Sequence, residues 1–148
     1  MFSAKLLIFA VIYSSTIYQS LAEISSAEAE IFKADPGDNP TKSLGKLVIT
    51  QIGSLVTIRG TLSGLSKGTH GFHVHEEGKL GDSCNAAGGR FNPNINLGDI
   101  RTSVTGATMV RVSNREISLK DIVGRSIVIY GNSADEGTRV ACGIIHAF

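Results

Sequence analysis

Alternating hydrophobic and polar residues divide most of the chain into short segments separated by glycine-rich turns. The clearest pair is 45–52 and 54–62, where Val56, Ile58 and Leu62 fall on one face of the second segment. Gly53 separates the two segments, so the pattern predicts a hairpin. Further strands are predicted over 27–34, 69–76, 126–130 and 140–147 and, with weaker alternation, over 101–112 and 115–119.

Two stretches break this rhythm. Residues 77–99 are rich in Gly, Asn and Asp, and residues 131–138 are small and polar. A loop as long as the first is uncommon unless it has a function. No segment carries a 3.6-residue apolar stripe over ten residues, so the number of short strands and turns predicts an all-β fold, an antiparallel sandwich or barrel.

The N-terminus has the order of a secretory signal peptide. Lys5 precedes an unbroken apolar run over residues 6–13, and Ser20-Leu21-Ala22 offers the small residues that a signal peptidase cleaves after. The alternative, a buried N-terminal helix or strand, has no amphipathic period to support it. We expect residues 1–22 to be removed and residues 23–148 to form one secreted, extracellular domain.

Charge and cysteine content narrow the class of protein further. Removing Lys5 from 14 basic residues leaves 13 against 13 acidic ones, so neither nucleic acid nor an anionic membrane is expected as a partner. No other stretch is long and apolar enough for a membrane helix. Cys84 and Cys142 are the only cysteines. In a secreted chain such a pair is usually a disulfide, and two buried free thiols are the alternative.

His73 and His75 are the sharpest chemical signal. Residues two apart in a strand project from the same face, so the two imidazoles point at one spot and could begin a copper or zinc site. Surface histidine pairs are frequent, however, and the spacing alone does not establish a metal site.

The surrounding motifs point to a family. They are His70-Gly71-Phe72-His73-Val74-His75, then Cys84-Asn85-Ala86-Ala87-Gly88-Gly89-Arg90-Phe91-Asn92-Pro93, Leu97-Gly98-Asp99-Ile100, Val123-Gly124-Arg125-Ser126, and Arg139-Val140-Ala141-Cys142-Gly143. In order and approximate spacing the chain resembles the copper/zinc superoxide dismutases, over essentially the whole of residues 23–148.

The resemblance implies an eight-stranded antiparallel Greek-key β-barrel. It also implies a disulfide between Cys84 and Cys142 that fastens the long loop to the barrel. It places Arg139 beside the copper, where the family uses an arginine to attract and orient superoxide, a role that a permanently charged fork of donors suits. The alternative for Arg139 is a hydrogen bond to the backbone of the Cys84 loop, and both roles can hold together.

The chain departs from the family at two copper positions. His73 and His75 match the first two of four copper histidines, but the bridging position is Arg90 and the fourth is Tyr130. Arginine has no lone pair to offer and stays protonated, so it cannot bridge two metals. A phenol with a pKa near 10 is a poor neutral ligand at pH 7.

The zinc site is reduced further. Only Asp99 remains of its ligands, Asn96 stands where a histidine is expected, and the middle histidine falls in a deleted part of the loop. One carboxylate cannot make a tetrahedral site, so zinc is not expected. We expect an ion pair between Arg90 and Asp99 to stand where zinc stood, with Arg90 in solvent as the alternative.

Three functions remain open from the sequence. The leading one is a secreted superoxide dismutase-like protein without catalysis, a pseudoenzyme that acts through a protein partner, through pairing as a dimer, or through weak copper binding at His73 and His75. The second is a residual or altered copper-dependent superoxide dismutase that converts superoxide to oxygen and hydrogen peroxide. The third is a structural barrel without metal.

Overall fold

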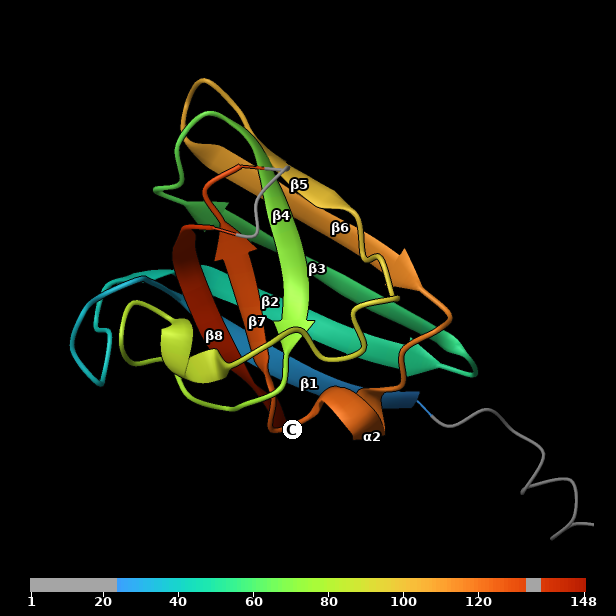
Figure 1. The fold of residues 1–148 in the computed structure, drawn as a ribbon. Helices are drawn as coiled ribbons and strands as arrows, with labels where there is room; N and C mark the ends of the chain where they lie inside the picture. The colour runs from blue at the N-terminus through green and yellow to red at the C-terminus, as the bar shows by residue number, and fades with distance from the viewer. Residues whose placement is uncertain (1–23, 133–136) are drawn as a thin grey trace, which may run out of the picture.

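Strands with one apolar face bury those faces together by closing into a barrel. The computed structural model describes residues 24–132 and 137–148, and within them eight antiparallel strands form a closed barrel (Figure 1). The strands are β1 (Ile24–Lys33), β2 (Ser43–Ile52), β3 (Leu55–Ser63), β4 (Gly68–His75), β5 (Asp99–Thr102), β6 (Ala107–Asn114), β7 (Ser126–Tyr130) and β8 (Arg139–Ala147). The all-β barrel prediction is confirmed.

The order of strands around the barrel is β1-β2-β3-β6-β5-β4-β7-β8. Strands β4, β5 and β6 are joined consecutively, and β3 lies beside β6 while β7 lies beside β4. This is the Greek-key arrangement, in which a fourth strand returns by a longer connection to flank a three-strand meander. As a result, β4 and β7 are neighbours in the sheet although the 50 residues 76–125 lie between them in the sequence.

The interior is formed mainly by aliphatic side chains. Leu47, Ile49, Ile58, Phe72 and Ile129 are fully buried, and they come from strands on all sides of the barrel. Gly143, in the Ala141-Cys142-Gly143 motif, sits where a Cβ would overlap the carbonyl oxygen of Glu30 on β1. Glycine at this position therefore allows β8 and β1 to approach closely enough to pair.

Strand β7 is buried on both faces. Ile127 and Ile129 point into the barrel core, while Val128 and Tyr130 pack outside it against Cys84, Ala87 and Cys142. The long loop after β4, with its 3-10 turn η1 (Asn85–Ala87), thus lies over the outside of β7. The disulfide between Cys84 and Cys142 fastens it there, which confirms the predicted bridge.

Two strand predictions need correction. The 101–112 segment is split by a turn, in which the Gly106 N–H bonds to the Ser103 carbonyl. Residues 115–119 do not form a strand, because the Asn114 side chain accepts the N–H groups of Glu116 and Ile117 and turns the chain. The helix α2 (Leu119–Ile122) follows and was not predicted, since four residues are too few to show a helical period.

Some predictions fall on residues outside this description. The signal peptide, residues 1–22, and residues 133–136 of the second loop are among them. Within the residues that are described, no helix has the length and apolar character needed to cross a bilayer.

Candidate metal centre

The two histidines of the His73-Val74-His75 motif converge on one side chain of the neighbouring strand. Strand β4 pairs with β7 from Phe72 opposite Ile129 to His75 opposite Ser126, which brings Tyr130 beside the motif. The ring centroid of Tyr130 lies 5.6 Å from that of His73 and 5.9 Å from that of His75. His75 and Tyr130 are buried, whereas His73 is half-buried.

Both ring nitrogens of His75 are engaged. Nδ1 lies 2.9 Å from the carbonyl oxygen of Gly88, and Nε2 lies 3.0 Å from the hydroxyl oxygen of Tyr130. A carbonyl oxygen can only accept, so Nδ1 carries the proton and the Nε2 of a neutral ring presents its lone pair. The Tyr130 hydroxyl therefore donates to Nε2. The lone pair that a metal would need is occupied by a phenolic proton.

The electrostatics of the site keep both imidazoles neutral. Burial lowers the pKa of His75 to about 4 against the opposing effect of the Gly88 carbonyl, and Arg139, His73 and Arg90 lower it further. The pKa of His73 is also lowered, chiefly by burial and then by Arg90, while Asp99 acts in the opposite direction. Neutral rings are the state that ligates metals, but here that state is maintained partly by neighbouring guanidinium charges, which would repel a metal cation.

Arg90 does not pair with Asp99, so the predicted ion pair is wrong. The guanidinium carbon of Arg90 lies 5.7 Å from the centroid of the Tyr130 ring, within the range of a cation–π contact. Among the described residues the ion pair within 4.0 Å is Lys46 with Glu28. Asp99 is exposed at the start of β5, where water competes for its carboxylate, whereas the half-buried Arg90 gains the aromatic face.

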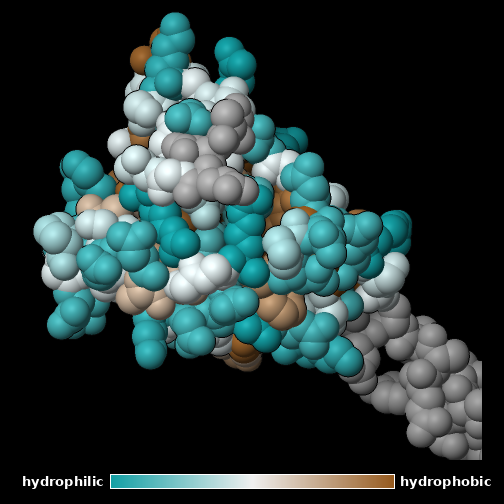
Figure 2. All heavy atoms as spheres, in the orientation of Figure 1, coloured by the Kyte–Doolittle hydropathy of each residue, from teal (hydrophilic) through white to brown (hydrophobic). Residues whose placement is uncertain are grey.

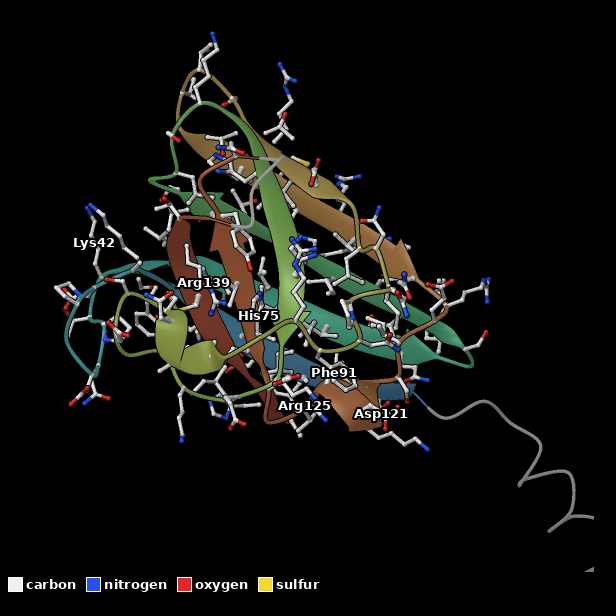
Figure 3. The ribbon with its side chains drawn as sticks, viewed as in Figure 1. Lys42, His75, Phe91, Asp121, Arg125 and Arg139 are labelled. Atoms are coloured by element: carbon white, nitrogen blue, oxygen red, sulfur yellow. A yellow bond between two sulfur atoms is a disulfide. The ribbon has the colours of Figure 1, made fainter. Side chains whose placement is uncertain are left out.

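The remaining predicted site residues either form hydrogen bonds to backbone groups or are exposed. Arg139 donates from Nη1 to the carbonyl oxygen of Cys84 at 3.0 Å, so its predicted bond to the loop is present. Figure 3 shows Arg139 and His75 close together beside the loop that carries η1. The Asn96 side chain accepts the N–H of Gly98 at 2.9 Å and forms a local turn rather than reaching toward His73.

These donors do not fit a resident copper or zinc ion. Within the described part of the chain, no three side chains of His, Cys, Asp or Glu gather closely enough to hold a metal. The cavity beside His73 and Arg90 has a volume of about 10 Å³, room for about one water molecule. Two imidazoles, one already bonded to a phenol, and an adjacent guanidinium make a poor site for a cation.

Three residues support the site through contacts that no sequence pattern reveals. The Gly88 carbonyl fixes the His75 tautomer, and nothing in the sequence marks it. Arg125 lies 3.8 Å from the centroid of the Phe91 ring and donates to the Asp121 and Glu76 carbonyls (Figure 3). His70 is buried, with its ring nitrogens each 2.7 Å from the carbonyl oxygens of Tyr130 and Ser66, so it holds the backbone of Tyr130 in place.

Comparison with known proteins agrees with this geometry at the level of the fold. The family model described as copper/zinc superoxide dismutase (SODC) matches residues 43–145. A protein named extracellular superoxide dismutase [Cu-Zn] from Haemonchus contortus is 39% identical over 154 aligned residues, covering 83% of this chain and 84% of its own. One of the same name from Caenorhabditis elegans is 35% identical, covering 88% and 73%.

Two further matches are more distant. The human copper chaperone for superoxide dismutase is 32% identical over 116 residues, which cover 60% of this chain but only 42% of the chaperone. The solved structure of the Cu/Zn superoxide dismutase from Brucella abortus is similar with a TM-score of 0.72 at 23% identity, and the match covers 82% of this chain and 99% of that one. The fold, the family model and the two extracellular relatives together place this chain in the copper/zinc superoxide dismutase family.

Proposed function

We propose that this chain is a secreted member of the family that has exchanged its metal centre for an internal hydrogen-bond network and has lost dismutase catalysis. One observation carries the proposal: the Tyr130 hydroxyl lies 3.0 Å from the Nε2 of His75, whose Nδ1 is bonded to Gly88. Dismutation requires an ion that is gripped in two oxidation states with an open position for superoxide. In this chain the Nε2 lone pair of His75 already accepts a hydrogen bond from the Tyr130 hydroxyl.

Arg90 supports the same conclusion. Its positive charge lies over the Tyr130 ring, close to where a copper ion would have to approach His73. Arg139 keeps the position from which the family attracts the anion, but its Nη1 bonds to the Cys84 carbonyl. In this proposal Arg139 is vestigial for catalysis and serves the loop instead. The relatives named extracellular support secretion, with residues 1–22 as the signal peptide.

Copper binding and superoxide decay test the proposal together. The mature chain, residues 23–148, is titrated with Cu(II) and with Cu(I) against a chromophoric competitor, and superoxide decay is followed with and without added copper. We expect at most weak copper binding through His73 and no decay beyond that of a His73→Ala, His75→Ala double variant. Stoichiometric copper together with rapid decay would overturn the proposal and favour a residual dismutase.

A gain-of-binding variant makes the test sharper. Tyr130→His removes the phenol and supplies an imidazole, and Arg90→His removes the charge beside it. We expect the double variant to bind copper at least about tenfold more tightly than the natural chain, the scale on which neighbouring groups tune metal affinity. His146→Ala is the matched control, because His146 is exposed near the C-terminus. If the Arg90→His, Tyr130→His double variant bound copper no more tightly than the natural chain, the role given to Tyr130 would be contradicted.

A further inference from the structure

A groove of about 480 Å³ opens on the outside of the barrel, and its lining includes none of the site histidines. It lies at the two loops 34–42 and 76–84, which run side by side next to β8 (Figure 1). Its volume is within the range of about 300–1,000 Å³ that is typical of small-molecule sites. The apolar part of its lining comes from both loops and from the strands beneath them: Phe32, Pro40, Leu80, Ala86 and Ile144.

The apolar floor of the groove is not part of the barrel core. Phe32 of β1 and Ile144 of β8 are half-buried, and among the described residues neither belongs to a cluster of buried apolar side chains. His146, two residues after Ile144 on the same strand, is polar and exposed. The apolar surface that Phe32 and Ile144 leave in water is therefore available to a ligand.

The walls of the groove are held in place by the fold. The N–H of Ser83 donates to the carbonyl of Asp35 at 2.8 Å, which joins one loop to the other. Gly81 lies so close to the first loop that a Cβ there would be 3.0 Å from the Cα of Asp38. The disulfide attaches the second loop to β8. A groove formed in advance spares a ligand the cost of ordering two loops.

Charged groups of both signs line the groove without pairing. Asp38 comes from the first loop and Lys79 from the second. In the part of the chain that the structure describes, the ion pair within 4.0 Å joins Lys46 to Glu28, so Asp38 and Lys79 do not neutralise each other. Asn39 adds an exposed amide that can donate and accept. The loops are mainly hydrophilic in Figure 2, so polar groups surround the apolar floor.

We propose that this groove binds a small zwitterion with an apolar side chain, the chemistry shared by free apolar amino acids and dipeptides. The ligand's ammonium group pairs with Asp38, its carboxylate pairs with Lys79, and its side chain covers Phe32 and Ile144. A neutral apolar ligand leaves both charges unused, and a ligand of one charge meets a like charge as well as an opposite one. The inference goes beyond the proposed loss of catalysis and does not depend on it.

L-Phenylalanine is the first probe. The mature chain, labelled with ¹⁵N, is titrated with it while the backbone amide signals are followed by NMR. We expect saturable shifts at Gly78, Leu80 and Gly81, with a dissociation constant of about 1 mM, the scale for a ligand of this size. Phenethylamine lacks the carboxylate and 3-phenylpropionate lacks the ammonium group, so each should bind at least about twofold more weakly. Leucyl-phenylalanine separates the two sources, because tighter binding than that of phenylalanine assigns the groove to dipeptides and weaker binding assigns it to free amino acids.

Matched variants locate the two charges. Asp38→Asn and Lys79→Gln are the test variants, and each should lower the affinity for phenylalanine by about two- to fivefold, the range of an exposed ion pair. Asp82→Asn and Lys42→Gln are the controls, because they change exposed side chains of the same loops outside the lining, and they should not lower it. Asp38→Asn should not weaken 3-phenylpropionate, and Lys79→Gln should not weaken phenethylamine, since each probe lacks the group that the changed residue would pair with.

Three results would overturn the proposal: no shifts at the groove, equal losses in test and control variants, or equal binding of the three phenyl probes. Sedimentation at the same concentrations tests a second copy as the occupant. A dimer that phenylalanine does not enter and that Ile144→Thr dissociates would assign the groove to that copy and overturn the zwitterion site. Circular dichroism and copper titration of the charge variants should match the natural chain, so that failure here is separable from failure of the proposed function.

Discussion

The hydroxyl of Tyr130 decides what the second ring nitrogen of His75 can bind. Because Nδ1 donates its proton to the Gly88 carbonyl, Nε2 is an acceptor. It accepts a hydrogen bond from the Tyr130 hydroxyl, whose oxygen lies 3.0 Å away. A histidine at this position in the sequence would present a second lone pair to the same space. A single residue therefore converts two candidate ligands into a satisfied, neutral hydrogen-bonded pair.

Acid should destabilise the chain through His75. An unfolded histidine has a pKa near 6.5, whereas burial lowers that of His75 to about 4. Between these values the unfolded chain binds more protons than the folded one, so the free energy of unfolding falls as the pH drops from about 6.5 to about 4. The lowered pKa of His73 acts in the same direction. Urea unfolding over this pH range measures the effect.

His75→Gln should flatten this pH dependence, since glutamine offers an amide without titrating. His146→Gln is the control, because His146 is exposed near the C-terminal end of β8. The three chains differ only at these histidines, so comparing them isolates the contribution of His75. An unchanged slope in the His75 variant would exclude the buried neutral imidazole as its source.

Arg125 depends on its planar shape as well as its charge. Its guanidinium carbon lies 3.8 Å from the centroid of the Phe91 ring, and it donates from Nε to the backbone carbonyl of Asp121 and from Nη1 to the backbone carbonyl of Glu76. Lysine cannot stack and donate in two directions at once. We expect Arg125→Lys to lower the free energy of unfolding by about 1–2 kcal/mol, measured by urea denaturation. Arg111→Lys, at an exposed site, should change it by less than about 0.5 kcal/mol, and equal losses would contradict the contact-based account.

At the scale of elements, the loop over β7 adopts a conformation that its residues do not favour. Asp82, Ser83 and Cys84 all have left-handed backbone angles, with φ of 53°, 52° and 66°. This conformation costs an ordinary residue roughly 1–2 kcal/mol. The disulfide and the Arg139 bond to the Cys84 carbonyl hold the segment in place.

Ser83→Gly should therefore stabilise the protein. Glycine adopts φ near +52° without the steric cost, although it loses more freedom on folding, so the net gain is expected to be up to about 1 kcal/mol. Thermal unfolding of the oxidised chain measures it. Ser113→Gly, on the regular strand β6, should instead destabilise by about 0.5–1 kcal/mol. Destabilisation at both positions would show that the left-handed segment carries no removable strain.

The sequence predicted the elements better than the contacts between them. Alternation marked β2 and β3 because each has one buried face, and β7 was visible as an apolar run because both of its faces are buried. The hairpin prediction held for the same reason. Residues 115–119 were misjudged because two side chains, Asn114 and Gln51, bond to backbone N–H groups there and override weak alternation.

The sequence identified the residues of the site, but not the hydrogen bond and ring contacts that they form with one another. The resemblance identified Arg90 and Tyr130 as replaced ligands, but the register of β4 on β7 brings Tyr130 to His75 across 55 residues of sequence. No local pattern encodes that register. The sequence suggested Asp99 or solvent as the partner of Arg90. In the folded chain Arg90 instead lies over the Tyr130 ring, a contact that depends on how the loop packs. Long-range placement is what sequence patterns cannot supply.

For the whole molecule, these contacts describe a barrel whose long loop is attached through groups of the protein itself. The loop is attached to β7 and β8 by the Cys84–Cys142 bridge, by Arg139 and by the packing of Ala87 against Val128 and Tyr130. Among the described residues no three side chains of His, Cys, Asp or Glu gather closely enough to hold a metal, so the proposed loss of the metal centre predicts that a chelator removes no structural ion. EDTA should leave the melting temperature of the oxidised chain unchanged.

Removal of the disulfide should have a large effect by contrast. The bridge joins residues 58 apart, and on the chain-entropy estimate closing such a loop stabilises the fold by about 4 kcal/mol. We expect Cys84→Ala with Cys142→Ala to lower the free energy of unfolding by about that amount in urea. Reduction of the natural chain should do the same, and EDTA should add nothing to either. A further loss with EDTA would show that a metal, rather than the bridge and Arg139, holds the loop against the barrel.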